Sequence, residues 1–540
     1  MVYDDGEIMY LRDDTNPSGS IAYFLQAVCF WFAFEEEHSM EQGICSIGVD
    51  MGTTDVKAIA FADDGHIIAR QDARLDTLTE TPGAAEQDPR TVYEVVTTTF
   101  ADAAHQARSL GYRVAHVGMS AAMHSLLAVR PDDAPLTRAF TWMDTRAAGQ
   151  ADALWATDQG KALYARTGTP IHAMSPLAKL LWLRQTRPEL LTQAARFVSL
   201  KEYVWHGWFG VWQVDASIAS ATGLYALSVN NWDTEALSLA GITPAQLSTL
   251  VPTTTTHVGL REPRLLSEGL TAETPFTIGA SDGALANLGV GALTSDRMAL
   301  TIGTSSAARV GINTPLTDPA TRPFCYVLAD GRYVVGGASN NGGSALDWLA
   351  RRALLGPVDV GALLAAAEHA SARDLLFLPY LAGERAPLWN AHAQGAFIGL
   401  TTQTDAVQLM RAAVEGIVFN ACWIASDLFT TVGRPRLLIA SGRLLETNWI
   451  RQLVADVSGI PVAFPAGADA STLGAVTLSA IASGALTWEA AIQQAEARLA
   501  THMQAQSGAR LATPRPDAQQ TFQARADRFR QTVAALRMGA

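Results

Sequence analysis

Short apolar runs alternate with longer segments of helical periodicity along most of the chain, beginning near residue 44. Buried strands read as short apolar runs, whereas helices repeat apolar residues every three or four positions. On this basis we predict strands at 45–49, 56–62, 114–120 and 436–442, a strand–turn–helix unit at 276–293, and helices at 92–110, 176–191, 406–429 and 470–484. Such alternation of strands and helices is typical of an α/β fold.

One pattern occurs twice: a strand, a Gly-Thr turn and a second strand. It reads SIGVDMGTTDVKAIAFA at 46–62 and MALTIGTSSAARVGI at 298–312. Because one such unit opens each half of the chain, the repeat predicts two similar domains that face one another. A chain of 540 residues also exceeds what a single hydrophobic core supports. We expect an N-terminal domain at 44–292, a C-terminal domain at 293–510 and a charged helical tail at 511–540.

The first 43 residues do not conform to this pattern. Their apolar run at 21–34 has 14 residues, fewer than the roughly 20 that span a bilayer. Its flanks are acidic, whereas a secretory signal begins with basic residues and ends at a small-residue cleavage site. We expect 1–43 to be an extension upstream of a functional chain that begins near Met40. A peripheral membrane helix is the alternative, although acidic flanks would be repelled by anionic lipid.

The overall charge and the cysteines exclude several classes of function. The formal net charge is −13, and a nucleic-acid footprint would need clustered lysine and arginine instead. The four cysteines lie far apart without CxxC spacing, which fits a reducing compartment and neither a disulfide framework nor a zinc site. We therefore expect a cytoplasmic protein whose partners are small molecules, with no nucleic acid and no membrane.

The two Gly-Thr turns offer groups that bind phosphate. Glycine lets a backbone approach a ligand closely, and successive N–H groups in a tight turn form an anion-binding nest. Side-chain hydroxyls add further donors. The candidate phosphate ligands are Gly52, Thr53, Thr54, Gly303, Thr304 and Ser305. Either turn alone would suit an ordinary hairpin, but a pair on opposed domains predicts a site for the phosphates of one nucleotide.

Two aspartates lie at predicted strand ends. Asp50 would repel a nucleotide triphosphate unless a cation lay between them, and Mg²⁺ is held in this way by one or two carboxylates, water and phosphate oxygens. Asp282, in the sequence GASDG, lies where a strand passes into a helix. There it is a candidate general base for a substrate hydroxyl in phosphoryl transfer. The alternatives are a turn-capping role for Asp50 and a helix N-cap role for Asp282.

The GASDG segment also matches the G-x-S-x-G pattern of serine hydrolases, with Ser281 as the nucleophile. A catalytic histidine would then follow, but His369 and His392 have no clear catalytic setting, and both Gly-Thr turns would stay unexplained. The sequence has no P-loop motif, no complete G-x-G-x-x-G and no H-E-x-x-H. These absences disfavour P-loop NTPases, Rossmann dehydrogenases and zincins.

Two polar loops between the turns are candidate substrate-binding segments. SAAMHSL at 120–126 and TWMDTRA at 141–147 follow predicted strands and combine aromatic and charged residues that suit a polyol or a sugar acid. An arginine there would also grip a carboxylate in bidentate fashion. The candidate substrate ligands are Met123, His124, Trp142, Asp144 and Arg146, together with Asp282.

These motifs resemble those of the FGGY carbohydrate kinases, which belong to the actin-like ATPases of ribonuclease-H fold. The likeness runs from about residue 44 to about residue 490. VDMGTTDVKA and LTIGTSSAARV resemble the two phosphate motifs, and IGASDGALANLG resembles the segment of the catalytic aspartate. IASGRLLETNWIRQLVADVSGIPV resembles the adenosine segment. GAFIGLTTQTDAVQLMRAAVE fits the second family signature, and MSPLAKLLWLRQT fits the first except at Thr186.

The resemblance implies ATP and Mg²⁺ as cofactors and two duplicated actin-like, ribonuclease-H-like domains around a cleft. It implies that Asp282 is the base, that Asp50 organises Mg²⁺ and that Thr53 and Thr304 contact phosphates. It also places Gly442 against adenine or ribose, and Gly337 and Asn341 near the nucleotide. One departure is Ser441-Gly442-Arg443 in place of paired glycines, so that Arg443 either crowds the base or reaches a phosphate.

The sugar is the finer question. The segments FTWMDTRA, FCYVLADGRYVVGGASNNGGSALDWL and FLPYLAGERAPLWNAHAQGAFIGL look most like those of gluconate kinases. This implies phosphorylation of D-gluconate to 6-phosphogluconate, with a xylulose, other ketose or polyol kinase as the alternative. A catalytically idle sugar or nucleotide sensor on the same scaffold is a further class, which the retained Asp282 disfavours. Homodimers are common among such kinases.

Overall fold

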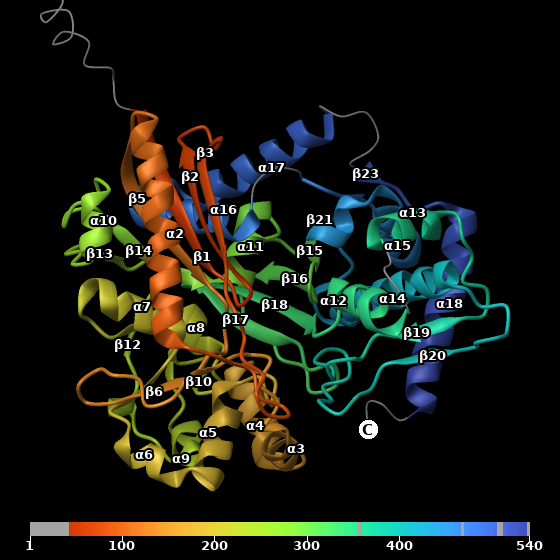
Figure 1. The fold of residues 1–540 in the computed structure, drawn as a ribbon, viewed down its shortest axis with the longest axis horizontal. Coiled ribbons are helices and arrows are strands. Elements are labelled where there is room, and N and C mark those ends of the chain that lie inside the picture. The colour runs from red at the N-terminus through yellow and green to blue at the C-terminus, as the bar shows by residue number, and fades with distance from the viewer. Residues whose placement is uncertain (1–42, 355–358, 466–468, 505–510, 537–540) are drawn as a thin grey trace, which may run out of the picture.

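The computed structural model describes residues 43–354, 359–465, 469–504 and 511–536 (Figure 1). The first strand begins at Gly43. The expected extension up to residue 42, including the proposed start near Met40, lies outside the described residues.

The first domain is built on a sheet of six strands in the order β13-β14-β5-β1-β2-β3. Strands β1, β2 and β3 are antiparallel neighbours, whereas β5 and β14 run parallel to β1. The short strand β13 closes the sheet antiparallel to β14. The strand bounds are β1 (Gly43–Met51), β2 (Asp55–Ala62), β3 (Ile67–Arg74), β5 (Tyr112–Ala121), β13 (Thr256–His257) and β14 (Phe276–Ser281).

The second domain repeats this topology in a sheet of seven strands, ordered β17-β18-β16-β15-β21-β22-β23. Strand β15 pairs antiparallel with β16 and parallel with β21, as β1 does with β2 and β5. The bounds are β15 (Arg297–Ile302), β16 (Ser306–Ile312), β17 (Phe324–Ala329), β18 (Arg332–Ser339), β21 (Leu437–Ser441), β22 (Val462–Ala463) and β23 (Leu511–Ala512). The predicted duplication of an actin-like unit is therefore confirmed.

Helices and small two-stranded sheets complete the first half. Helix α2 (Pro89–Ser109) packs on β2 and β3, and most of the others form the lower left of Figure 1. These helices are α3 (Ala148–Trp155), α4 (Asp158–Thr167), α5 (Pro176–Thr186), α6 (Pro188–Gln193), α7 (Leu200–Phe209), α8 (Ala216–Ser220), α9 (Thr234–Ala240) and α10 (Pro263–Ser267), with a 3₁₀ turn at Pro244–Gln246. The small sheets pair β4 (Glu86–Gln87) with β7 (Ala139–Phe140), β6 (Leu127–Val129) with β8 (Arg196–Val198), β9 (Gln213–Asp215) with β12 (Thr249–Val251), and β10 (Tyr225–Ala226) with β11 (Asn231–Trp232).

The single helix predicted at 176–191 is wrong. The chain breaks it at Arg187 into α5 and α6, and Arg187 has φ −142° and ψ 53°. Proline has no N–H to donate, and it disfavours helical geometry in the residue before it. Pro188 therefore ends one helix and starts the next.

The second half carries the remaining helices. They are α12 (Gly343–Trp348), α13 (Val360–Glu368), α14 (Ala406–Val432), α15 (Asn448–Ser458), α17 (Trp488–Gln504) and α18 (Pro516–Ala535), with a π-helical turn at Leu349–Ala353, a 3₁₀ turn at Arg443–Glu446 and a hairpin of β19 (Leu376–Leu378) with β20 (Ala396–Ile398). Helix α14 is long and apolar enough to cross a membrane, but 78% of its most apolar window is buried inside the protein. It is the core helix of the second domain, packed on β18 and β19.

Two helices, α11 (Asp282–Val290) and α16 (Ala470–Ala482), cross between the domains. Although α16 follows the second sheet in the sequence, it packs on β1 and β5 of the first, and Figure 1 shows it in blue among the orange strands. Glycines make this close approach possible. A Cβ on Gly474 would lie 1.9 Å from the Leu285 carbonyl oxygen, and one on Gly289 would lie 2.1 Å from that of Ala470. The site described next lies around the N-terminal ends of these two helices.

Candidate active site

The two Gly-Thr turns meet at one cavity. Thr53 and Thr54 follow β1, while Thr304 and Ser305 precede β16, and all four line a cavity of about 220 Å³. Thr54, Gly303 and Thr304 also line a wider cleft of about 1190 Å³. The repeated motif thus brings backbone and hydroxyl groups from both domains to the same space.

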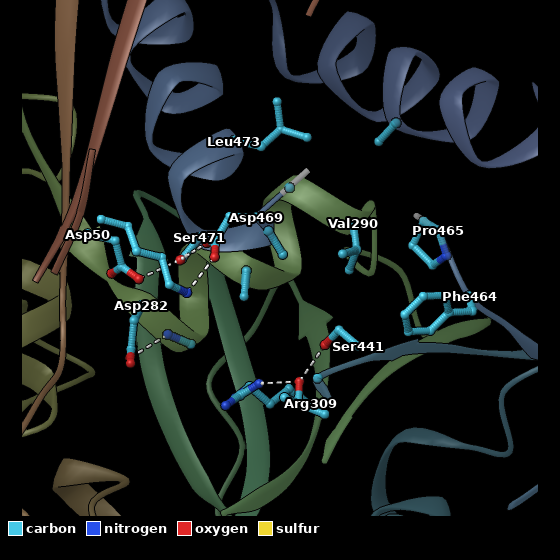
Figure 2. A pocket seen from close by; sticks show the side chains of 18 of the residues that line it. Asp50, Asp282, Val290, Arg309, Ser441, Phe464, Pro465, Asp469, Ser471 and Leu473 are labelled. Atoms are coloured by element: carbon cyan, nitrogen blue, oxygen red, sulfur yellow. Dashed lines mark hydrogen bonds and ion pairs between the residues drawn. The ribbon is translucent and has the colours of Figure 1, made fainter. Parts of the chain in front are cut away.

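A cluster of charged groups lines a third cavity, of about 640 Å³. The Asp50 carboxylate is 6% exposed and accepts hydrogen bonds from the hydroxyls of Ser120 at 2.6 Å and Ser471 at 2.7 Å. Lys57 Nζ pairs with Asp469 Oδ2 at 2.5 Å. Figure 2 shows Asp50, Asp282 and Asp469 at one end of this cavity and Phe464 and Pro465 at the other.

The environment of Asp50 disfavours its charge. Burial, together with the nearby carboxylates of Asp469 and Asp282, raises the pKa of Asp50 to about 6. Lys57 acts in the opposite direction. Within the described residues, no group of three or more His, Cys, Asp or Glu side chains is arranged to hold a metal ion. A cation near Asp50 would therefore need water or a ligand to complete its coordination.

Asp282 is the first residue of α11 and directly follows β14. Its Oδ1 accepts a hydrogen bond from the Gly283 N–H at 2.6 Å, and its side chain lines both the 640 Å³ and the 220 Å³ cavities. Burial raises the pKa of Asp282, and the positive charge of Arg309 opposes this effect. The carboxylate thus stands where the two cavities adjoin, with one oxygen fixed by the backbone.

Besides Asp282, three of the predicted substrate ligands line the 220 Å³ cavity: Met123, His124 and Trp142. Trp142 Nε1 donates to Thr53 Oγ1 at 2.9 Å, which ties the loop to the first Gly-Thr turn. His124 has φ 71° and donates from Nδ1 to the Ala221 carbonyl at 2.8 Å. Burial holds the pKa of His124 well below its usual value, so His124 serves as a neutral hydrogen-bonding group.

Asp144 and Arg146 lie elsewhere, lining neither the 640 Å³ nor the 220 Å³ cavity. Arg146 pairs with Asp144 at 2.6 Å and with Glu86 at 2.5 Å. Its guanidinium also lies over the rings of Phe140 and Trp182. The charge of Arg146 is therefore already compensated by two carboxylates, and neither Asp144 nor Arg146 faces these two cavities.

Of the residues predicted to lie near the nucleotide, some line the cleft and others are buried away from it. A Cβ on Gly337 would meet Ile424 and Ala386, and Asn341 is buried with its amide donating to the Gly383 carbonyl at 2.9 Å. Neither residue lines the 1190 Å³ cleft, which is lined instead by Gly343, Ser344 and Asp347.

Gly442 and Arg443 do lie at the cleft. Gly442 has φ 94°, and a Cβ there would lie 2.5 Å from the Ile302 carbonyl oxygen, so only glycine fits against β15. The exposed Arg443 lines both the 640 Å³ and the 1190 Å³ cavities. It therefore stands between two regions of the cleft, where its charge can reach a phosphate.

Sequence reasoning missed several charged residues at these cavities. Lys57 could have been noticed as a single cation in an apolar strand. Its partner Asp469 lies just before α16, 412 residues further along the chain. Arg309 in β16 and Arg385 both line the 220 Å³ cavity. No local spacing connects these residues, because the fold alone brings them together.

Ser281 does not have the surroundings of a hydrolase nucleophile. It is fully buried, and its Oγ accepts a hydrogen bond from Ser217 at 3.0 Å. Among the described residues no histidine bonds to it. This arrangement gives the serine-hydrolase hypothesis no base to activate the hydroxyl.

Two actin-like domains with a Gly-Thr turn on each side of a cleft form the architecture expected of a phosphoryl-transfer enzyme. Comparison with known proteins agrees: residues 45–289 match the N-terminal domain, and residues 298–483 the C-terminal domain, of the FGGY family of carbohydrate kinases. The chain belongs to this family, whose kinases transfer a phosphoryl group from ATP to a sugar.

Gluconokinases are among its most similar relatives. Gluconokinase of Bacillus subtilis (strain 168) is 39% identical over 450 residues, which are 81% of this chain and 87% of that protein. Xylulose kinase of Escherichia coli (strain K12) is 30% identical over 452 residues, covering 81% of this chain and 90% of that protein. The crystal structure of gluconate kinase from Lactobacillus acidophilus matches with a TM-score of 0.83 at 31% identity, covering 92% of this chain and 98% of that one.

Proposed function

We propose that the protein transfers the γ-phosphoryl group of ATP to the terminal hydroxyl of a sugar acid, and that D-gluconate is this acid. The observation that carries the proposal is the position of Asp282, whose carboxylate lines both the cavity beside the charged cluster and the cavity beside His124 and Trp142. A base at this junction can reach a substrate hydroxyl on one side while the phosphate donor occupies the other.

The nucleotide occupies the cleft between the turns. The backbone N–H groups around Gly52 and Gly303 face its phosphates, and the hydroxyls of Thr53 and Thr304 add donors. Lys57 lines both the 640 Å³ and the 1190 Å³ cavities, so its ammonium lies along the path of the phosphate chain. Arg443 supplies a second cation at the same boundary.

Mg²⁺ fits the donors present near Asp50. The ion prefers hard oxygen ligands and keeps several waters, and each Asp50 oxygen accepts one serine hydroxyl while retaining further acceptor capacity. Asp50 would hold the ion, through its waters or directly, with Asp469 nearby. When bound, Mg²⁺ neutralises charge on the β- and γ-phosphate oxygens.

The chemical step follows from these positions. The terminal hydroxyl of the sugar transfers its proton to the free oxygen of Asp282 while its own oxygen forms a bond to the γ-phosphorus. The bond from the γ-phosphorus to the β–γ bridging oxygen breaks, and ADP leaves with that electron pair. General-base assistance of this kind contributes about 10²–10⁴-fold in rate, and the raised pKa of Asp282 improves its ability to accept the proton.

A neutral ketose such as D-xylulose is the second candidate, which the 30% identity to xylulose kinase of Escherichia coli favours. ADP release by purified protein with Mg·ATP distinguishes the two when D-gluconate, D-xylulose, L-ribulose and glycerol are compared. We expect D-gluconate to give the highest kcat/KM. If the protein phosphorylated D-xylulose but not D-gluconate, the proposed substrate would be wrong, whereas the proposed role of Asp282 would stand.

A further inference from the structure

The strand that leads to Asp282 is irregular. In the first sheet β14 lies between β5 and the short strand β13, and β13 pairs with Phe276 and Thr277, at the start of β14. The register of β14 with β5 shifts between Thr277 and Ala280, where Gly279 has φ 72°. A bulge of this kind interrupts strand pairing and re-aims the side chains that follow it. The backbone just before Asp282 therefore depends on partners outside the sheet.

Ser217 of α8 supplies one of these partners. Its Oγ accepts a hydrogen bond from the backbone N–H of Ser281 at 3.1 Å, and its hydroxyl donates to Ser281 Oγ at 3.0 Å. Both residues are fully buried, and α8 packs against β14 (Figure 1). A buried backbone N–H needs an acceptor within the protein, and the serine hydroxyl takes this role. It fixes the peptide N–H one residue before Asp282.

Lys201 of α7 holds the residue before that. It is 2% exposed, and its Nζ donates to the Ala280 carbonyl at 3.3 Å and pairs with Asp215 Oδ2 at 2.7 Å. Asp215 in turn caps α8, because its Oδ1 accepts from the Ile218 N–H at 2.9 Å. The buried ion pair therefore links the helix that carries Ser217 to the backbone of Ala280.

These two residues act at a distance from any ligand. Neither Ser217 nor Lys201 lines any of the three cavities described above. They contact the chain just before Asp282, and the Gly283 N–H holds Asp282 Oδ1 from the other side at 2.6 Å. The position of the second carboxylate oxygen depends on these anchors. Misplacement of a reacting group by about 1 Å can lower a rate about 10²-fold.

We propose that Ser217 and Lys201 are positioning residues for phosphoryl transfer, which hold the end of β14 so that the Asp282 carboxylate stands at the junction of the two cavities. The inference rests on the proposed function, in which Asp282 is the base. It predicts that both residues affect the chemical step and not the binding of either substrate.

Ser217→Ala tests this prediction, because it removes the acceptor of the Ser281 N–H. We expect kcat to fall about 10–100-fold, while KM for the sugar and for Mg·ATP changes by less than about twofold. ADP release is measured with whichever of the four compounds compared above gives the highest turnover, and circular dichroism verifies the fold. A raised KM with unchanged kcat would overturn the proposal.

A double-mutant cycle separates positioning from a general loss of stability. Asp282→Asn has no base to position, so adding Ser217→Ala to it should lower kcat by less than about a further twofold. Additive losses would overturn the positioning role while leaving the proposed base in place. A near-normal kcat of Asp282→Asn alone would overturn the base, and this inference with it.

Ser220→Ala is the matched control. Ser220 lies in the same helix and is fully buried, and its Oγ also accepts a hydrogen bond from a strand N–H, that of Val327 in β17, at 3.0 Å. Urea unfolding should show a loss of stability similar to that of Ser217→Ala, while kcat stays within about twofold of the wild type. An equal fall of kcat in both variants would show that α8 contributes packing alone, against the proposal.

Lys201 is tested together with its partner, because Lys201→Met alone would leave the buried Asp215 carboxylate unpaired. Lys201→Met combined with Asp215→Asn removes both charges, and the amide oxygen still accepts the hydrogen bond that caps α8. We expect this double variant to fold, as judged by circular dichroism, and to lower kcat about 10-fold with KM unchanged. A folded double variant with the kcat of the wild type would reject the role of Lys201.

Discussion

At the scale of single residues, Asp282 and Ser281 are adjacent but face different surroundings. Asp282 lines two cavities, whereas Ser281 is buried against Ser217. We expect Asp282→Asn to lower kcat by about 10²–10⁴-fold, because the amide cannot accept the proton. Binding of Mg·ATP, measured by calorimetry, should be retained.

Ser281→Ala supplies the internal control for this experiment. It removes a hydroxyl that lines none of the three cavities described above, so phosphoryl transfer should continue. If Ser281→Ala were inactive while Asp282→Asn stayed active, Asp282 would not be the base, and the serine-hydrolase hypothesis would be favoured instead.

The protonation of Asp50 makes the stability of the protein depend on pH. Its pKa is raised from 3.8 to about 6, so between these values the native state binds more protons than the unfolded state. Stability contributed by this group is present at low pH and is lost as pH rises through about 6. The shift corresponds to about 3 kcal/mol.

Asp50→Asn removes this penalty. Without metal, the variant should unfold at a higher urea concentration than the wild type at pH 8, and the difference should shrink towards pH 4. With Mg·ATP the order should reverse, because only the wild type gains binding energy from the ion. An Asp50→Asn variant that is less stable than the wild type at pH 8 without ligand would be evidence against the raised pKa.

What the sequence revealed at this scale depends on local chemistry. Asp50, Thr53 and Asp282 lie in short motifs, and their proposed roles were inferred from the residue types and spacing of those motifs. Arg146 was predicted to bind a carboxylate because it lies in a polar loop after a predicted strand, yet its guanidinium pairs with Asp144 and Glu86.

At the scale of elements, the crossing of α11 and α16 depends on glycine. Gly474→Ala would place a methyl group 1.9 Å from the Leu285 carbonyl oxygen. Overpacking of this kind costs about 1–3 kcal/mol. We expect a matching loss in the free energy of unfolding measured with urea.

Gly149→Ala is the matched control. Gly149 lies in α3, and a Cβ there meets nothing within 4 Å. Alanine is the better helix former by about 1 kcal/mol, so this variant should be at least as stable as the wild type. If both alanine variants were equally stable, the crossing would not be as tightly packed as its geometry indicates.

The elements that could be predicted are those whose apolar patterns are locally consistent. The repeated strand–turn–strand units and the long helix α14 were both visible as patterns. The break at Arg187 was not recognised, although Pro188 was its signal. The tail was predicted as a helix, but not that Arg525 of α18 pairs with Glu415 of α14 at 2.6 Å, since a pattern within one element does not identify its partner.

At the scale of the whole molecule, the duplication could be inferred from the repeat, but the exchange of α16 could not. The predicted domain boundary at 292–293 assigns the first sheet to one domain and α16, the helix that packs on this sheet, to the other. Leu473 and Val476 of α16 form a cluster with Ile59 and Phe61 of β2. Thr277 also donates to Ser479 of α16 at 2.9 Å. The first domain is therefore completed by a segment that the chain reaches only near its end.

This arrangement predicts that residues 43–292 do not fold to a native state alone. Without α16, the isolated fragment would expose Ile59, Phe61 and the apolar side of α11 to water, and the loss of burial costs about 25 cal/mol for each Å² of apolar surface. We expect it to bind the dye ANS, to lack near-ultraviolet circular dichroism and to unfold without a cooperative urea transition. Mixing with fragment 293–540 should restore all three native properties, because it supplies α16. Cooperative unfolding of the isolated fragment would show instead that the first sheet can be stable without the helix, and that α16 serves the crossing between the domains rather than the core of the first.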